Sequence, residues 1–186
     1  MLDKTASKKL LKLAREAVAA AVSGKPIPES RVEDESLQAR CGVFVTLKTD
    51  GRLRGCLGRF SSEKPLWRTV REMAAAAATE DPRFIANRIS PEEVGDVEIE
   101  ISVLSPLEKT DRPLKDMKLG IHGIYIRAGG QSGCFLPQVA EEMGWDKETF
   151  LDNCCRHKAG LPAGAWRDNP DVEIHLFTAE IISSAD

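Results

Sequence analysis

An aspartate–glycine pair between two strand-like stretches is the feature that most constrains the fold of this chain. Asp50-Gly51 follows the apolar-rich run Gly42–Thr49 and precedes Arg52–Leu57. This dipeptide accepts the left-handed backbone angles that a two-residue hairpin turn requires. The sequence therefore predicts an antiparallel hairpin, and it places the Arg54-Gly55-Cys56 segment on the second strand.

Helical patterns lie on both sides of this hairpin. Apolar residues recur at helical spacing from Thr5 to Val22. A second helical pattern begins after Pro65, and the sequence Asp81-Pro82-Arg83-Phe84 ends it. Ser90-Pro91-Glu92-Glu93 is a capping box with proline at the first helical position, which predicts a further short helix.

Strand patterns and short helices alternate irregularly in the rest of the chain. The expected strands are Val97–Val103, Gly123–Arg127, Cys134–Leu136 and Glu173–Ile182. Short helices are expected after Pro137 and after Asp146. Hairpins and helices are mixed without strict strand–helix–strand alternation. The predicted class is therefore α+β, with an antiparallel or mixed sheet and covering helices.

The length, charge and apolar content of the chain limit its domain number and its classes of binding partner. We expect one domain over residues 1–186, with a larger and a smaller lobe. The net charge of −3 argues against a nucleic-acid-binding surface. No stretch approaches the ~20 apolar residues that span a bilayer, so we expect no membrane association.

The cysteines indicate a reducing compartment. They are odd in number and form no Cys-x-x-Cys pair, and charged residues interrupt any apolar run at the N-terminus, so we expect no signal peptide. We therefore expect reduced thiols and a cytoplasmic location. The five cysteines are Cys41, Cys56, Cys134, Cys154 and Cys155.

Cys56 is the strongest candidate for chemistry. Gly55 and Gly58 surround it, and Arg54 and Arg59 are close in sequence. Glycine lets another group approach the backbone, and nearby guanidiniums favour the thiolate, which is the reactive form. The functional interpretation is a nucleophile, a redox thiol or a covalent acceptor. The structural alternative is a small buried residue at a tight, glycine-flanked bend.

Other polar residues are candidates for the same site. Glu100 is either a general base or substrate anchor, or an ordinary outward-facing residue of its strand. His122 is either an acid–base group beside Cys56 or a structural residue at a strand edge. Arg54 either binds an anionic group or forms a solvent-exposed ion pair. The expected catalytic residues are Cys56, Glu100 and His122, and the expected substrate-binding residues are Arg54, Gly55, Arg83 and Gln138.

The sequence predicts no metal site and identifies no cofactor. Cys56, His122, Cys155 and His157 could supply ligands, but their spacing matches no known metal motif. The glycine-rich segment Gly129–Gly133 lacks the lysine and the serine or threonine that end a phosphate-binding Walker loop. We interpret this segment as a hairpin turn.

Six ordered motifs in this chain resemble the AMMECR domain family. They are Gly42–Leu47, Leu53–Gly58, Asp81–Phe84, Glu98–Pro106, Leu136–Ala140 and Lys158–Pro162. The resemblance implies a two-lobed α+β fold with a cleft. The prokaryotic branch is called AmmeMemoRadiSam system protein A, a name that implies association with a Memo-type protein and a radical S-adenosylmethionine protein. The family resemblance supplies no established reaction.

Two classes of function are therefore expected. The first is an enzyme, or a component of an enzyme system, that uses Cys56 to modify an unknown small molecule or a partner protein. The second is a non-catalytic binding or scaffold protein for the Memo-type and radical S-adenosylmethionine partners. The first requires an accessible, reactive thiol, whereas the second requires an exposed apolar patch and a dispensable Cys56.

Overall fold

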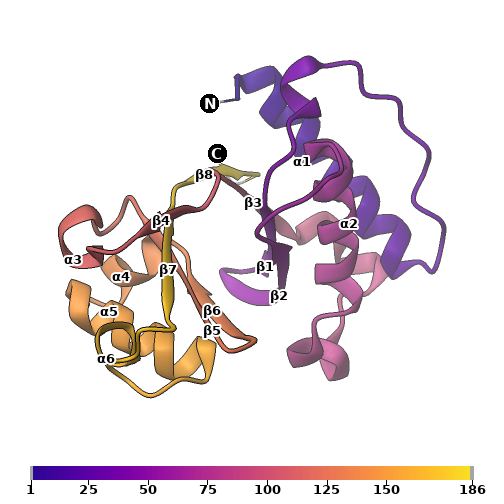
Figure 1. Ribbon diagram of the computed structural model, residues 1–186. Helices are drawn as coiled ribbons and strands as arrows, with labels where there is room; N and C mark the ends of the chain where they lie inside the picture. The colour runs from indigo at the N-terminus through magenta and orange to yellow at the C-terminus, as the bar shows by residue number, and fades with distance from the viewer. Residues whose placement is uncertain (1, 185–186) are drawn as a thin grey trace. The chain divides into compact units, whose positions relative to one another are not determined.

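The computed structural model describes residues 2–184, which form two compact units (Figure 1). The first unit comprises residues 2–104 and 180–184, and the second comprises residues 105–179. A hydrophobic core and a four-stranded sheet are found in each unit. The fold is α+β, as the sequence predicts.

The sheet of the first unit is built around the predicted hairpin. Its strands are β1 (Val43–Thr49), β2 (Arg52–Arg59), β3 (Glu98–Leu104) and β8 (Ala179–Ser183), in the order β2-β1-β3-β8. Strand β1 pairs antiparallel with both β2 and β3. The turn residues Asp50 and Gly51 have φ angles of 51° and 71°. These angles fit a two-residue hairpin turn, so the prediction from Asp50-Gly51 is confirmed.

Two helices form the core of the first unit together with one face of this sheet. They are α1 (Lys4–Val22) and α2 (Leu66–Thr79), which pack side by side in Figure 1. Their apolar residues bury Val43, Val45 and Leu47 of β1. Three short 3-10 helices complete the unit: η1 (Glu35–Gln38), η2 (Pro82–Asn87) and η3 (Pro91–Asp96). The capping box at Ser90–Glu93 is present at the start of η3.

The second unit has a sheet with helices packed into its core. Its strands are β4 (Glu108–Thr110), β5 (Gly123–Ala128), β6 (Gln131–Phe135) and β7 (Glu173–Phe177), in the order β4-β7-β5-β6. Its helices are α3 (Pro113–Asp116), α4 (Gln138–Glu142), α5 (Lys147–Cys154) and α6 (Ala165–Asp168), and a π-helical turn, η4 (Cys155–Ala159), continues α5. Ile124 and Ile126 of β5 are fully buried with Phe150 of α5 in the core.

The predicted closing strand over 173–182 differs from the observed structure. It is divided into β7 and β8, which belong to different sheets. The division falls at Thr178, whose amide donates to Ser105 Oγ at 2.9 Å and whose carbonyl accepts from the Ser105 amide at 3.0 Å. Ser105 and Thr178 are 73 residues apart in the sequence, so no local signal marks the break.

The glycine-rich turn of the second unit matches its interpretation. Gly129 and Gly130 join β5 to β6 with φ angles of 55° and 84°, which a two-residue hairpin requires. Within residues 2–184, no helix combines the length and the apolar character needed to cross a membrane.

Both glycines around Cys56 are needed for close packing. A Cβ at Gly55 would lie 2.0 Å from the carbonyl oxygen of Ala77 in α2. A Cβ at Gly58 would lie 2.4 Å from the ring of Phe44. Gly55 therefore sets how closely α2 approaches the sheet, and these two glycines have a structural explanation that is independent of chemistry.

We expect Gly55→Ala to destabilise the first unit by about 2–4 kcal/mol, because backbone atoms of α2 would have to move to admit one methyl group. The free energy of unfolding, measured with denaturant, tests this. Gly95→Ala is the matched control, since no atom lies within 4 Å of a Cβ at Gly95. Equal stability of the two variants would contradict the packing role of Gly55.

Candidate functional site

Cys56 lies in a row of polar side chains on the sheet face opposite α1 and α2. In the strand register, Thr46 of β1 is paired with Cys56 on one side and with Glu100 of β3 on the other. Their side chains share one face, because neighbouring Val45 and Leu47 point into the core. We call Cys56, Thr46 and Glu100 the polar row. Within it, Thr46 Oγ1 donates a hydrogen bond at 3.3 Å to the sulfur of Cys56, which is a partly exposed residue.

A lysine completes the far end of the polar row. Lys48 Nζ lies 3.0 Å from Glu100 Oε2. Two strand spacings place Glu100 about 10 Å from Cys56, so its carboxylate is not positioned to take a proton directly from the thiol. The sequence reasoning missed Lys48, although period-two alternation with Thr46 places both on one face.

The backbone of Cys56 is held by the motif that follows α2. The Cys56 amide donates to Asp81 Oδ2 at 2.9 Å, and Arg83 Nη2 donates to the Cys56 carbonyl at 3.3 Å. Arg83 also donates to both carboxylate oxygens of Asp81, at 3.0 and 2.7 Å. Because β2 is an edge strand, these two side chains supply the hydrogen bonds that a neighbouring strand would provide.

Asp81 is a strong anion in this arrangement. Its side chain is 2% exposed. The hydrogen bonds from Arg83, helped by the Cys56 amide, lower the pKa of Asp81 from 3.8 to about 2 against the opposing effect of burial. The same ion pair raises the pKa of Arg83. The sequence reasoning missed Asp81 as a site residue, although its place before Pro82 marks it as a helix N-cap.

The side chain of Arg54 forms an ion pair with Glu93 and not with Cys56. A β-bulge between Leu47 and Lys48 leaves Arg54 outside the pairing register, and such irregularities redirect side chains. Arg54 Nη1 lies 2.7 Å from Glu93 Oε1, and the Arg54 side chain is 11% exposed. This contact is the main reason that the pKa of Glu93 falls to about 2. The charge of Arg54 is thus compensated within the fold.

The remaining predicted residues belong to the second unit. His122 Nδ1 accepts a hydrogen bond from the Lys118 amide at 3.1 Å, and His122 lines a cavity of about 340 Å³ with Lys109 and Asp116. Gln138 begins α4, and its Oε1 is buried without a hydrogen-bond partner among residues 2–184. The first unit thus contains Arg54, Gly55, Cys56, Arg83 and Glu100, and the second contains His122 and Gln138.

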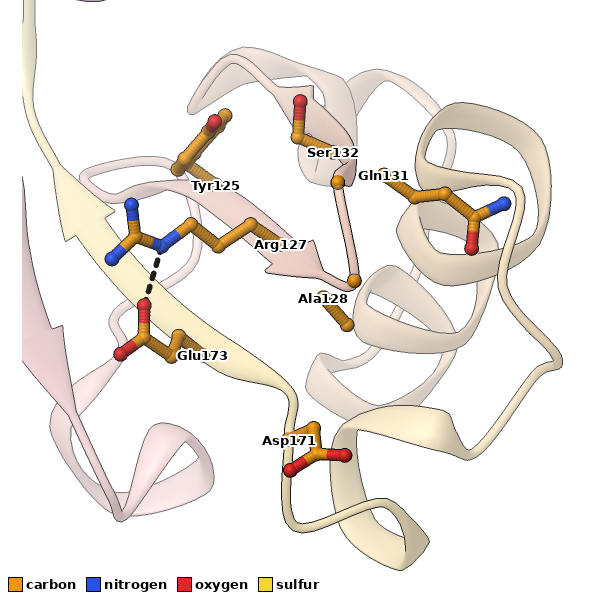
Figure 2. Close-up of a pocket in the computed structure, with 9 residues that line it drawn as sticks. Tyr125, Arg127, Ala128, Gln131, Ser132, Asp171 and Glu173 are labelled. Atoms are coloured by element: carbon orange, nitrogen blue, oxygen red, sulfur yellow. Dashed lines mark hydrogen bonds and ion pairs between the residues drawn. The ribbon is translucent and has the colours of Figure 1, made fainter.

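A second cavity of this unit, of about 350 Å³, lies at the β5–β6 hairpin (Figure 2). Tyr125 and Arg127 of β5 contribute to it together with Ser132 of β6. Arg127 Nε donates to Glu173 Oε2, the interaction drawn in Figure 2. The lining carries both charge signs, which suits a small polar ligand. Alternation along β5 places Tyr125 and Arg127 on one face, and the sequence reasoning did not use that signal.

Burial affects three of the other four thiols. All five cysteines are free. Burial raises the pKa values of Cys41, Cys154 and Cys155, which keeps these thiols protonated at neutral pH. In the described part of the chain, no three His, Cys, Asp or Glu side chains are grouped so as to hold a metal ion.

Asp81 gives the first unit a pH-dependent stability. Because the folded-state pKa is lowered, ionised Asp81 stabilises the fold above about pH 4, and this contribution disappears as the pH falls through about 2. Asp81→Asn should therefore reduce the free energy of unfolding by about 1–2 kcal/mol at pH 7, a figure reduced for the exposure of Arg83.

Denaturant unfolding at several pH values measures this effect. The difference between wild type and Asp81→Asn should shrink toward pH 2. Asp96→Asn serves as the control, because Asp96 is an exposed residue of η3. A constant difference across this range would show that the Asp81 charge is not responsible.

Comparisons with known proteins agree with the motifs and the fold. Residues 11–182 match the model of the AMMECR1 family. A protein of Methanopyrus kandleri is 44% identical over 180 residues, covering 92% of this chain and 85% of its own. A protein of Nanoarchaeum equitans is 41% identical and covers 92% and 97%. The crystal structure of an uncharacterised Pyrococcus horikoshii protein has a TM-score of 0.86 at 36% identity, covering 97% of this chain and 92% of that one. The chain therefore belongs to the AMMECR1 family.

Proposed function

We propose that this protein is an enzyme, or a component of an enzyme system, in which Cys56 accepts a group from a small molecule or a partner protein. The observation that carries the proposal is the 3.3 Å hydrogen bond from Thr46 Oγ1 to the sulfur of Cys56, a partly exposed residue. A hydroxyl that donates to sulfur stabilises negative charge there, and the charged sulfur is the nucleophile.

Acyl transfer is the simplest reaction of this kind. Cys56 Sγ attacks the carbonyl carbon of an activated acyl donor and forms a thioester. The bond to the leaving group breaks, the leaving group keeps the bonding electrons, and the thiol proton passes to it. Donor and thiol thus become thioester and protonated leaving group, with no further reagent.

Residues around the thiol have separate roles in this proposal. The Lys48–Glu100 pair binds a polar part of the substrate at the far end of the polar row. Asp81 and Arg83 are positioning residues, because they hold the Cys56 backbone. Arg54 and Gly55 are not assigned to the substrate, since Glu93 occupies Arg54 and Gly55 packs against α2.

A scaffold function is the second candidate, and the glycine packing favours it. Gly55 and Gly58 are accounted for by contacts with Ala77 and Phe44. The motif around Cys56 therefore needs no chemistry to explain its glycines. In this alternative, the protein binds its partners without reacting, and Cys56 is dispensable.

The partners and the compartment are part of the proposal. We expect a Memo-type protein and a radical S-adenosylmethionine protein to act with this chain. The resemblance of its six motifs to the AMMECR domain family, whose prokaryotic branch is named for that association, supports this expectation. A cytoplasmic location is supported by five cysteines that are all free.

Acetylation by p-nitrophenyl acetate, followed by mass spectrometry of the intact protein and its peptides, tests the reactive thiol. Wild-type protein should gain one acetyl group at Cys56, and Cys56→Ser should lose that adduct. Thr46→Val keeps the side-chain shape but removes the hydrogen bond to sulfur. It should react about tenfold more slowly, which corresponds to about 1.4 kcal/mol.

Cys155→Ser is the control, because Cys155 is buried. This variant should keep the Cys56 adduct while losing about 1 kcal/mol of stability, a typical effect of one substitution. Full activity of Cys56→Ser in an assay with both proposed partner proteins would exclude the catalytic role and favour the scaffold.

A further inference from the structure

A cavity of about 460 Å³ lies in the first unit between α2 and the segment that precedes η1. The lining residues important for its chemistry are Pro28, Glu29, Trp67, Arg68, Arg71 and Glu72. None of them belongs to the polar row around Cys56. The cavity is therefore a second, separate candidate site in this unit.

Arg71 is a buried cation without an anionic partner among residues 2–184. Its exposed fraction is 9%, although it is charged. Its Nη2 donates to the Pro28 carbonyl, whereas its Nε is buried without a hydrogen-bond partner. Among residues 2–184, no carboxylate oxygen lies within 4.0 Å of its guanidinium nitrogens. A buried charge of this kind is costly unless an ion pairs with it.

Trp67, which lines the same cavity, carries a second donor without a partner among the described residues. Its side chain is buried, with an exposed fraction of 6%, and its Nε1 has no hydrogen-bond partner in the described part of the chain. The guanidinium carbons of Arg68 and Arg71 lie 5.0 and 5.7 Å from the centroid of its ring. These ring contacts stabilise the cations but leave the N–H groups unpaired.

The two carboxylates that line the cavity, Glu29 and Glu72, do not neutralise the charge of Arg71. Glu72 accepts a hydrogen bond from Lys64 Nζ at 2.7 Å, so its charge is already compensated. Glu29 is exposed, and within residues 2–184 it forms no ion pair. Glu29 is thus the residue that would compete with, or repel, an anion arriving from solvent.

We propose that this cavity binds a small organic anion. A carboxylate or phosphate group of the ligand accepts hydrogen bonds from Arg71 and Arg68, and an apolar ring or chain packs against Trp67 and Pro28. The volume suits a ligand of this size, and the lining combines two guanidiniums with the apolar surfaces of Trp67 and Pro28. The inference needs no reaction at Cys56.

Titration with benzoate, phenyl phosphate and benzamide, observed by NMR, tests the site. The signals to follow are those of Trp67 Nε1–H and Arg71 Nε–H, with the indole signal assigned through Trp67→Phe. Benzoate or phenyl phosphate should shift both signals at millimolar concentration. Benzamide has a similar shape without the charge and should leave them in place. The stronger of the two anions identifies the carboxylate or the phosphate as the preferred group.

Variants separate binding from folding. Arg71→Met keeps an apolar side chain in the core and should fold at least as stably as wild type, since it removes an unpaired buried charge. It should weaken anion binding at least about tenfold. Arg68→Gln, at an exposed position, should also weaken binding, whereas Glu29→Gln should strengthen it.

Arg59→Gln is the matched control, because Arg59 is an exposed arginine of β2 outside this cavity. It should bind the anions as wild type does. The proposal is overturned if benzamide shifts the two signals as strongly as benzoate, if neither anion shifts them, or if Arg71→Met binds as well as Arg59→Gln.

Discussion

The contact between Gly55 and Ala77 is the constraint on which the first unit depends. Gly55 has no Cβ, and the carbonyl oxygen of Ala77 in α2 occupies the space that a Cβ would fill. This approach closes the core between the helices and the sheet. Since side chains alternate along a strand, it also sends Cys56 to the opposite face, where Thr46 and Glu100 share its row. One packing contact thus determines both the core and the position of the thiol.

The motif that contains Asp81 and Arg83 binds the unpaired edge of strand β2. Asp81 and Arg83, 25 and 27 residues after Cys56, bind the amide and the carbonyl of that residue. An ionised carboxylate accepts such bonds more strongly than a neutral group, and Arg83 keeps Asp81 ionised. The ion pair therefore both closes the sheet edge and fixes the backbone that carries the sulfur. Two motifs that are separate in sequence form one structural unit around Cys56.

Local signals were sufficient for much of the fold. Asp50-Gly51, the capping box at Ser90 and the helical pattern after Thr5 each encode their structure within a few residues, and each is present as predicted. The break at Thr178 and the partner of Arg54 depend on residues distant in sequence, so no short pattern contains them. The candidate site was predicted less completely for the same reason: a sequence motif contains candidate residues, but pairing register decides which of them are neighbours.

Three arginines of the first unit differ in whether a carboxylate of the fold compensates their charge. Arg54 and Arg83 are paired with Glu93 and Asp81, and both carboxylates have pKa values near 2. Each arginine is therefore neutralised by a carboxylate of the same unit, and each also donates to a backbone carbonyl. Arg71 is about as enclosed as Arg54, whereas Arg83 is more exposed, and Arg71 has no such anion among the described residues. A buried guanidinium without a counter-ion contributes little to stability. Its presence beside a cavity is better explained by an anion that comes from outside the chain.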